Sequence, residues 1–75
     1  MDANALKARI VLKGYKVDEF IDLVNEKGTK MSRSAYYKGL SGEHEYGRSQ
    51  IQAISETLEL DDEEIIDIFF KWKVS

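Results

Sequence analysis

The segment Ser32-Arg33-Ser34-Ala35-Tyr36-Tyr37-Lys38-Gly39-Leu40-Ser41-Gly42 carries the signals that begin and end a short helix. Serine is a preferred N-cap residue, and glycine readily adopts the left-handed conformation that ends many helices. Tyr36 and Leu40 lie four residues apart, so they share one face of that helix. The opposite face keeps hydroxyl and cationic side chains. The segment therefore predicts a helix over residues 32–41 with one docking face and one polar face.

Apolar residues upstream of this segment also recur at helical spacing. Leu6, Ile10 and Val11 predict the inner face of a first helix that ends at Gly14. A second apolar stripe begins at about residue 17 and predicts a helix that ends near Gly28.

Two further helices are expected downstream. Apolar residues between 51 and 58 mark a fourth helix, which begins near Gly47. Asp61 and Glu64 then form the acidic analogue of a capping box, directly before the most apolar segment of the chain. This box favours a helix over a strand, so we expect a C-terminal helix at about residues 61–72.

These elements predict an all-α fold, a compact bundle of about five helices. At 75 residues the chain has room for a single domain, residues 1–75. The second and third helices are short and joined by a turn, which predicts a helix-turn-helix at about residues 16–42.

The composition narrows the classes of function. The chain has no cysteine, which excludes a disulfide framework and thiolate chemistry. No stretch approaches the roughly 20 apolar residues that span a bilayer, and the N-terminus lacks the apolar core of a signal peptide. These features predict a cytoplasmic protein without a membrane segment.

Charge is distributed unevenly along the chain. Residues 1–42 hold eight cationic and five anionic side chains, whereas residues 43–75 hold three and nine. The formal net charge of −3 is therefore the sum of a basic N-terminal part, residues 1–42, and an acidic C-terminal part, residues 43–75. Such asymmetry is a hint of a nucleic-acid-binding face, although solvated helix faces produce it as well.

The sequence contains no pattern that is typical of a catalytic site or a metal site. The single histidine, His44, lies between Glu43 and Glu45, and adjacent side chains point in different directions. A metal site needs three or four converging ligands, so we expect a solvated loop histidine. No nucleophile is paired with a base, and no glycine-rich phosphate loop is present. We expect no enzyme, no cofactor, no metal and no small-molecule substrate.

The segment 32–42 resembles the recognition helix of the lambda-repressor-like, Cro/C1-type regulators, whose common pattern is S-x-x-T-hydrophobic-S-R-x-L-N-G. Ser32 matches the capping serine, Tyr36 the buried hydrophobe, Leu40 the leucine and Gly42 the terminal glycine.

Two flanking segments extend the resemblance to roughly residues 5–70. Residues 14–21 look like the G-L-T-Q-x-E-L-A opening of the first motif helix, and residues 60–70 are similar to the fifth helix of short phage-encoded members. The resemblance implies a DNA-binding transcriptional regulator from a phage or mobile element.

The chain departs from the family pattern at two places. Family members usually begin the first motif helix with a glutamine that grips a phosphate and braces a recognition residue, whereas Lys16 and Val17 stand here. Residues 25–31 also form a longer connection than the usual tight turn. A longer connection is expected to influence the angle at which the third helix is presented.

In a helix-turn-helix the second helix enters the major groove with its N-terminal residues against base edges. Arg33, Ser34 and Tyr37 are the expected base readers, and Lys16, Lys30 and Lys38 the expected phosphate contacts. The full set of expected DNA-binding residues is Lys16, Lys30, Ser32, Arg33, Ser34, Tyr37, Lys38 and Ser41.

Other interpretations of the sequence remain open. The polar face of the third helix is also compatible with simple solvation. A protein-interaction module, such as an anti-repressor or a polymerase-binding adaptor, could use the acidic C-terminal part and the aromatic residues Phe69, Phe70 and Trp72. The same C-terminal apolar residues are candidates for a homodimer contact, because helix-turn-helix dimers read two half-sites.

Overall fold

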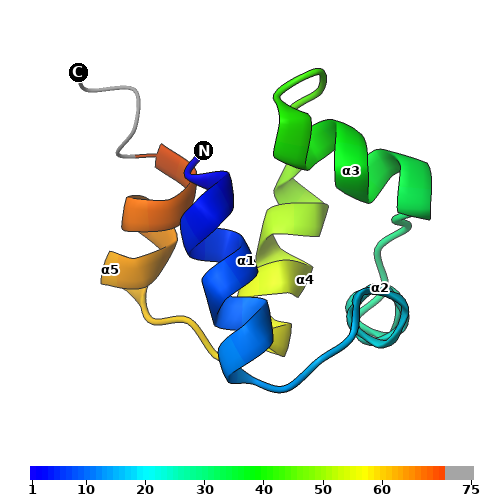
Figure 1. Ribbon diagram of the computed structural model, residues 1–75, viewed down its shortest axis with the longest axis horizontal. Coiled ribbons are helices and arrows are strands. Elements are labelled where there is room, and N and C mark those ends of the chain that lie inside the picture. The colour runs from blue at the N-terminus through cyan, green and yellow to red at the C-terminus, as the bar shows by residue number, and fades with distance from the viewer. Residues whose placement is uncertain (71–75) are drawn as a thin grey trace.

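The computed structural model describes residues 1–70, which form a compact all-α bundle (Figure 1). Its helices, in chain order, are α1 (Ala3–Leu12), α2 (Val17–Glu26), α3 (Arg33–Ser41), α4 (Arg48–Thr57) and α5 (Asp62–Ile65), followed by the π-helical turn η1 (Ile66–Phe70). The predicted all-α fold of five helices is thus confirmed. No helix of residues 1–70 has both the length and the apolar character needed to span a membrane.

Local capping explains where the helices begin. The side chain of Ser32 accepts a hydrogen bond from the backbone N–H of Ala35 at 3.0 Å, as the sequence predicts for the start of α3. Asp2 caps α1 in the same way through the N–H of Ala5. α3 ends at Gly42, whose φ of 85° lies in the left-handed region.

The capping box at α5 is also confirmed. Asp61 Oδ1 accepts from the N–H of Glu64 at 2.8 Å, and Glu64 Oε1 accepts from the N–H of Asp61 at 3.0 Å. The helix beyond it differs from the expected span of 61–72, because the α-helical part ends at Ile65 and continues as η1. Residues 71 and 72 of the expected span, including Trp72, lie outside the described residues.

The wider turn of η1 places two consecutive residues, Ile68 and Phe69, in the core, while Ile66 and Phe70 face outward. Phe69 is therefore not available for the C-terminal contact surface that the sequence suggested. Of the two described aromatic residues in that set, only Phe70 is exposed.

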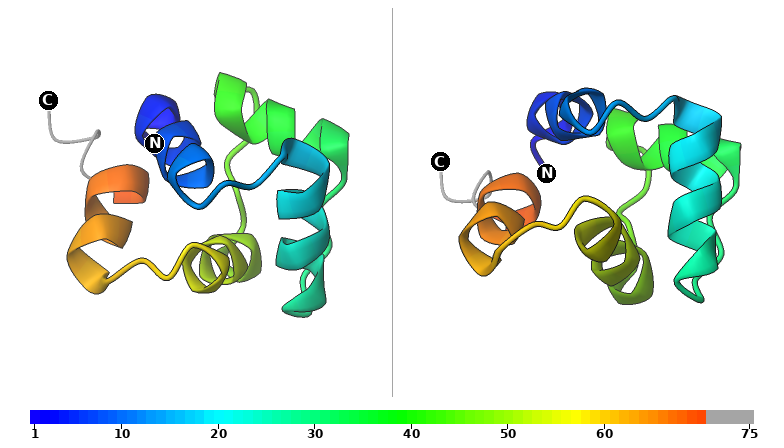
Figure 2. Two further views of the ribbon diagram at one scale, coloured as in Figure 1. Left: turned by 60° about the horizontal axis from the view of Figure 1, so that its bottom comes forward. Right: turned by 90° about the horizontal axis from the view of Figure 1, so that it is seen from below.

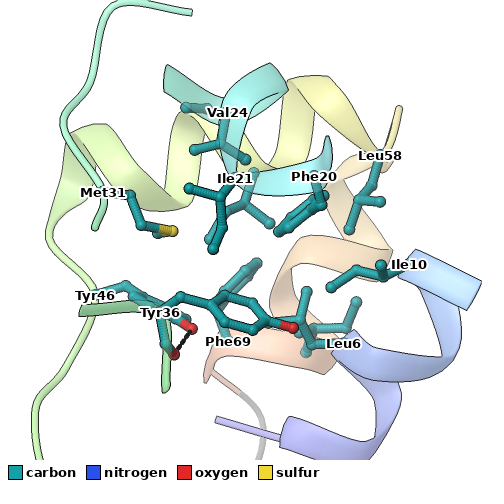
Figure 3. Packing of buried hydrophobic residues seen from close by; sticks show 13 residues of the cluster. Leu6, Ile10, Phe20, Ile21, Val24, Met31, Tyr36, Tyr46, Leu58 and Phe69 are labelled. Atoms are coloured by element: carbon teal, nitrogen blue, oxygen red, sulfur yellow. Dashed lines mark hydrogen bonds between the residues drawn. The ribbon is translucent and has the colours of Figure 1, made fainter. Parts of the chain in front are cut away.

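All five α-helices surround one core, to which α5 adds the partly buried Ile65 (Figure 3). Its most deeply buried side chains are Phe20, Leu6, Ile54 and Val24. The ring of Phe20 packs edge-on against Tyr36, with centroids 6.0 Å apart, and this contact joins α2 to α3.

The prediction that Val11 faces the core is wrong. Leu6 and Ile10 are buried, whereas Val11 and Leu12 are 73% and 78% exposed. Successive helical residues are rotated by roughly 100°, and α1 contacts the core only along the line through residues 6 and 10.

Figures 1 and 2 show α2 and α3 at one end of the molecule and α1 with α5 at the other. α4 lies between these two ends and packs against α2. The pair α2–α3 therefore forms one end of the bundle, where α2 packs against α4.

Candidate nucleic-acid interface

α3 has a docking face and an open face, as its sequence suggests. Tyr36 is buried and Leu40 is partly buried against the core. The outward residues Arg33, Ser34, Tyr37 and Lys38 are exposed, together with Ser41. α3 thus presents cationic, hydroxyl and phenol groups on one continuous surface.

Gly39 completes the docking face, and the sequence analysis missed this role. A Cβ atom at position 39 would overlap the ring of Tyr46, so the close packing of α3 on Tyr46 requires glycine. Glycine inside a helix costs about 0.5–1 kcal/mol relative to alanine. Such an unfavourable residue within a predicted helix was the signal that a packing contact lies there.

Tyr46 also holds α3 through a hydrogen bond. Its hydroxyl donates to the carbonyl oxygen of Tyr36 at 2.6 Å, inside the core (Figure 3). Burial raises the pKa of the Tyr46 hydroxyl far above its usual value, and it raises the pKa of Tyr36 in the same direction. Both phenols are therefore neutral at physiological pH.

The long connection between α2 and α3 is closed by one side chain, Asn25. Its Oδ1 accepts from the N–H of Met31 at 2.6 Å, and its Nδ2 donates to the carbonyl of Met31 at 2.9 Å. Met31 is almost fully buried, and Gly28 turns the chain with a φ of 102°. Although the connection is long, the two hydrogen bonds between Asn25 and Met31 hold its two ends together.

The same connection is attached to the start of α4. The hydroxyl groups of Thr29 and Ser49 share a hydrogen bond of 2.9 Å. Gln50 donates from Nε2 to the carbonyl of Lys30 at 3.0 Å and accepts from the N–H of Gly47 at 3.0 Å. These contacts fix how the turn lies relative to the bundle, and so they help to set the direction of α3.

The lysines predicted to contact phosphate lie at three separate positions around α3. Lys16 immediately precedes α2, Lys30 lies in the turn, and Lys38 lies on α3 itself; all three are exposed. Within residues 1–70 their ammonium groups form no ion pair with a carboxylate.

Ser32 and Ser41 form hydrogen bonds with the backbone at the two ends of α3. The Ser32 hydroxyl caps the N-terminus, as described above. The Ser41 hydroxyl donates to the carbonyl of Lys38 at 3.1 Å and accepts from the N–H of Glu43 at 3.4 Å. Of the two, Ser32 lies beside the expected base readers, and Ser41 lies at the far end of the helix.

Arg33 is engaged in an ion pair that the sequence analysis did not foresee. Its Nη1 lies 2.8 Å from Oδ1 of Asp18, in the first turn of α2. Both side chains remain open to solvent, with 61% and 69% of their surface exposed.

The cations of α1 differ from those around α3, because two of them are neutralised. Arg9 pairs with Glu64, and Lys13 donates to Glu59 at 2.6 Å. The contact with Glu59 raises the pKa of Lys13, and the hydrogen bond from Lys13 lowers the pKa of Glu59. Within residues 1–70, the lysines that lie before α2, in the turn and on α3 thus differ from Arg9 and Lys13 in having no carboxylate partner.

A polar hollow lies beside α3, between this helix and the segment that leads into α4. Ser34, Lys38, His44 and Gln50 contribute to its lining, and Glu45 contributes one acidic side chain. His44 is exposed, as expected, and its backbone N–H donates to the backbone carbonyl of Lys38 at 3.2 Å. The hollow extends the polar face of α3 toward the N-terminus of α4.

Comparison of the chain with protein-family models, with curated proteins and with solved structures finds no match in any of the three. The interpretation of this surface therefore depends on its own geometry and charge.

Proposed function

We propose that this protein is a sequence-specific double-stranded-DNA-binding regulator of transcription, of the lambda-repressor-like class, that inserts α3 into the major groove. The observation that carries the proposal is the open face of α3, where Arg33, Ser34, Tyr37 and Lys38 are exposed on a helix whose other face is docked. The major groove admits an α-helix and displays a distinct donor and acceptor pattern for each base pair.

The exposed groups suit two different tasks. Arg33 is able to donate to O6 and N7 of guanine, Ser34 to pair with several base edges, and Tyr37 to pack on a thymine methyl group. Lys16, Lys30 and Lys38 suit phosphate contacts, which position a protein without reading sequence. The open N-terminal half of α3 is where helix-turn-helix proteins make base contacts.

A net charge of −3 is compatible with this function because attraction to a phosphate backbone depends on where the individual cations lie. The acids at positions 59 and 64 pair with cations of α1, at the end of the molecule away from α3. Within residues 1–70, Lys16, Lys30 and Lys38 form no ion pair, so their ammonium groups are available to contact a phosphate backbone.

Selection of duplexes from a random pool at physiological salt tests the proposal. We expect enrichment of a defined site, and an enriched palindrome would indicate that a dimer binds. Arg33→Ala should relax the enriched site at one base pair while the variant keeps its helical circular dichroism. Recovery of random sequences with the folded wild-type protein would refute sequence-specific binding.

A second candidate function, a protein-interaction module, is favoured by a different surface. An apolar groove between α4 and α5 is lined by Ile51, Leu60 and Ile65, with Glu56 at its rim. Ile66 and Phe70 are half exposed. A homodimer through the C-terminal apolar residues would use Ile66 and Phe70 rather than Phe69, which is buried.

Amide chemical shifts distinguish the two functions. DNA binding predicts that adding a duplex shifts the amides of residue 16 and residues 30–42. An interaction module predicts no response to DNA and shifts within residues 51–70 when the partner protein is added.

A further inference from the structure

The ion pair between Asp18 and Arg33 links the two helices at the end of α3 that is proposed to read bases. Asp18 lies in the first turn of α2, and Arg33 is the first residue of α3. Their 2.8 Å contact is the only ion pair between α2 and α3 within residues 1–70. It therefore fixes the direction of one exposed side chain relative to both helices.

This pair contributes little to the stability of the fold. Both side chains are mostly exposed, and exposed ion pairs are weak because water and salt screen them. Its main physical effect is on the conformations of Arg33. An arginine side chain has many rotamers, and each interaction that restricts them before binding reduces the entropy lost on binding.

The chemistry of the guanidinium group allows Arg33 to contact Asp18 and DNA together. A guanidinium carries five N–H donors in one plane. Asp18 contacts one terminal nitrogen, Nη1. The remaining donors stay available for the O6 and N7 acceptors of a guanine, the partner that arginine contacts most often in the major groove.

We infer that Asp18 is a positioning residue for base recognition, which holds Arg33 in the orientation that reads one base pair. This inference rests on the proposed DNA-binding function. The carboxylate of Asp18 also repels phosphate, so it lowers affinity for every duplex. Asp18 therefore increases discrimination between sequences and reduces the affinity for DNA in general.

The test compares Asp18→Asn with Asp22→Asn. Asp22 is an exposed carboxylate one turn further along α2 and forms no ion pair with Arg33. Both substitutions remove one negative charge from the same helix. Dissociation constants are measured by fluorescence anisotropy on the selected duplex, on its single-base-pair variants and on a scrambled duplex. Arg33→Ala first identifies the base pair that Arg33 reads.

Both asparagine variants should bind the scrambled duplex more tightly than the wild type. Only Asp18→Asn should lose discrimination at the base pair of Arg33, by about two- to fivefold, the scale of one exposed ion pair. Asp18→Glu, which keeps the carboxylate, should retain part of that discrimination. In an Arg33→Ala background, Asp18→Asn should change discrimination no further. Melting curves check that each variant is folded.

Three outcomes are informative in different ways. If Asp18→Asn discriminates as well as Asp22→Asn, the positioning role is wrong while the DNA-binding function stands. If Arg33→Ala loses discrimination at no base pair, the inference also fails and other residues read the DNA. If the folded wild-type protein binds all duplexes equally, the proposed function fails, and the inference fails with it.

Discussion

Different kinds of interaction stabilise the two ends of this molecule, the end formed by α2 and α3 and the end formed by α1 and α5. The end that carries α2, the turn and α3 depends on partly or fully buried neutral hydrogen bonds, from Asn25 to Met31 and from Tyr46 to Tyr36, and has the exposed ion pair of Asp18 and Arg33 at its surface. The end that carries α1 and α5 depends, besides its apolar contacts, on ion pairs at the surface, such as that between Lys13 and Glu59.

The difference concerns how strictly each kind of interaction fixes the position of a helix. Partly or fully buried hydrogen bonds are directional, and losing one partner leaves a polar group without compensation. Exposed ion pairs are weaker and respond to salt and pH. The face proposed to read DNA is thus attached to the bundle by directional hydrogen bonds, and its exposed Asp18–Arg33 pair orients a side chain rather than holding the helix in place.

The largest effect is expected at Asn25, which closes the connection between α2 and α3. Asn25→Ala removes two hydrogen bonds and leaves the N–H and carbonyl of Met31 without these partners. We expect a loss of about 3 kcal/mol in the free energy of unfolding. Urea denaturation of the wild type and the variant measures this difference in the free energy of unfolding. Asn4→Ala, on the exposed surface of α1, is the matched control and should change stability by less than about 0.5 kcal/mol. Equal effects of the two variants would remove the contrast between the ends.

The next effect concerns DNA binding. Arg33→Ala should cost about 1–3 kcal/mol in binding the selected duplex and should relax specificity at one base pair. Lys30→Ala should weaken binding to all duplexes about equally and should reduce the slope of log K against log salt by about one. Titrations at several salt concentrations separate these two patterns.

Lys7, an exposed lysine of α1, provides the control for both DNA-binding variants. It has the same charge but lies at the opposite end of the molecule. Lys7→Ala should leave the affinity and the salt slope nearly unchanged. A loss as large as that of Lys30→Ala would show that the binding surface is not centred on α3.

Gly39→Ala should have a smaller but measurable effect on stability. The added methyl group overlaps the ring of Tyr46, and this overpacking outweighs the better helix propensity of alanine. We expect a net loss of about 1–2 kcal/mol, measured by thermal unfolding. Gly47→Ala is the control, since its Cβ would meet only Gln50, at 4.0 Å. An unchanged or higher melting temperature for Gly39→Ala would contradict the close packing of α3 on Tyr46.

The smallest effect is the response of the exposed ion pair to pH. The pKa of Glu59 is lowered by Lys13, so its contribution to stability is present above the ordinary pKa of glutamate and is lost as pH falls through the lower, folded value. The pKa of Lys13 is raised by Glu59, so its contribution is present below the ordinary pKa of lysine and is lost as pH rises through the higher, folded value.

Hydrogen exchange as a function of pH locates this response in the molecule. Acid should increase opening in α1 and α5 before it affects α3, and Glu59→Gln should reduce this acid effect. At alkaline pH both ends should weaken, because the raised pKa values of Tyr46 and Tyr36 favour the neutral phenols in the folded state. Equal acid sensitivity of α1 and α3 would contradict the assignment of the acid response to the pair of Lys13 and Glu59.

Sequence patterns predicted the parts of this structure that depend on neighbours along the chain. Ser32, Gly42 and the pair Asp61 and Glu64 act within one helical turn, so their roles follow from local geometry. The exposure of Arg33 on the open face of α3 follows from the spacing of the apolar residues.

Contacts between distant residues were not predictable in this way. The closure of the turn by Asn25, the need for glycine at position 39 and the outward direction of Val11 depend on how the helices dock. The same is true of the partner of Arg33, because Asp18 lies fifteen residues earlier and only the packing of α2 against α3 brings them together.

The sequence alone determined an all-α chain, the starting points of its helices and a short helix with a cationic, hydroxyl-rich face, because capping and periodicity act over a few residues. Only the tertiary structure decided which cations stay without a carboxylate partner and which direction α3 takes. Both depend on groups far apart in the chain, such as Lys13 with Glu59 and Lys30 with Gln50, that meet only when the bundle is assembled.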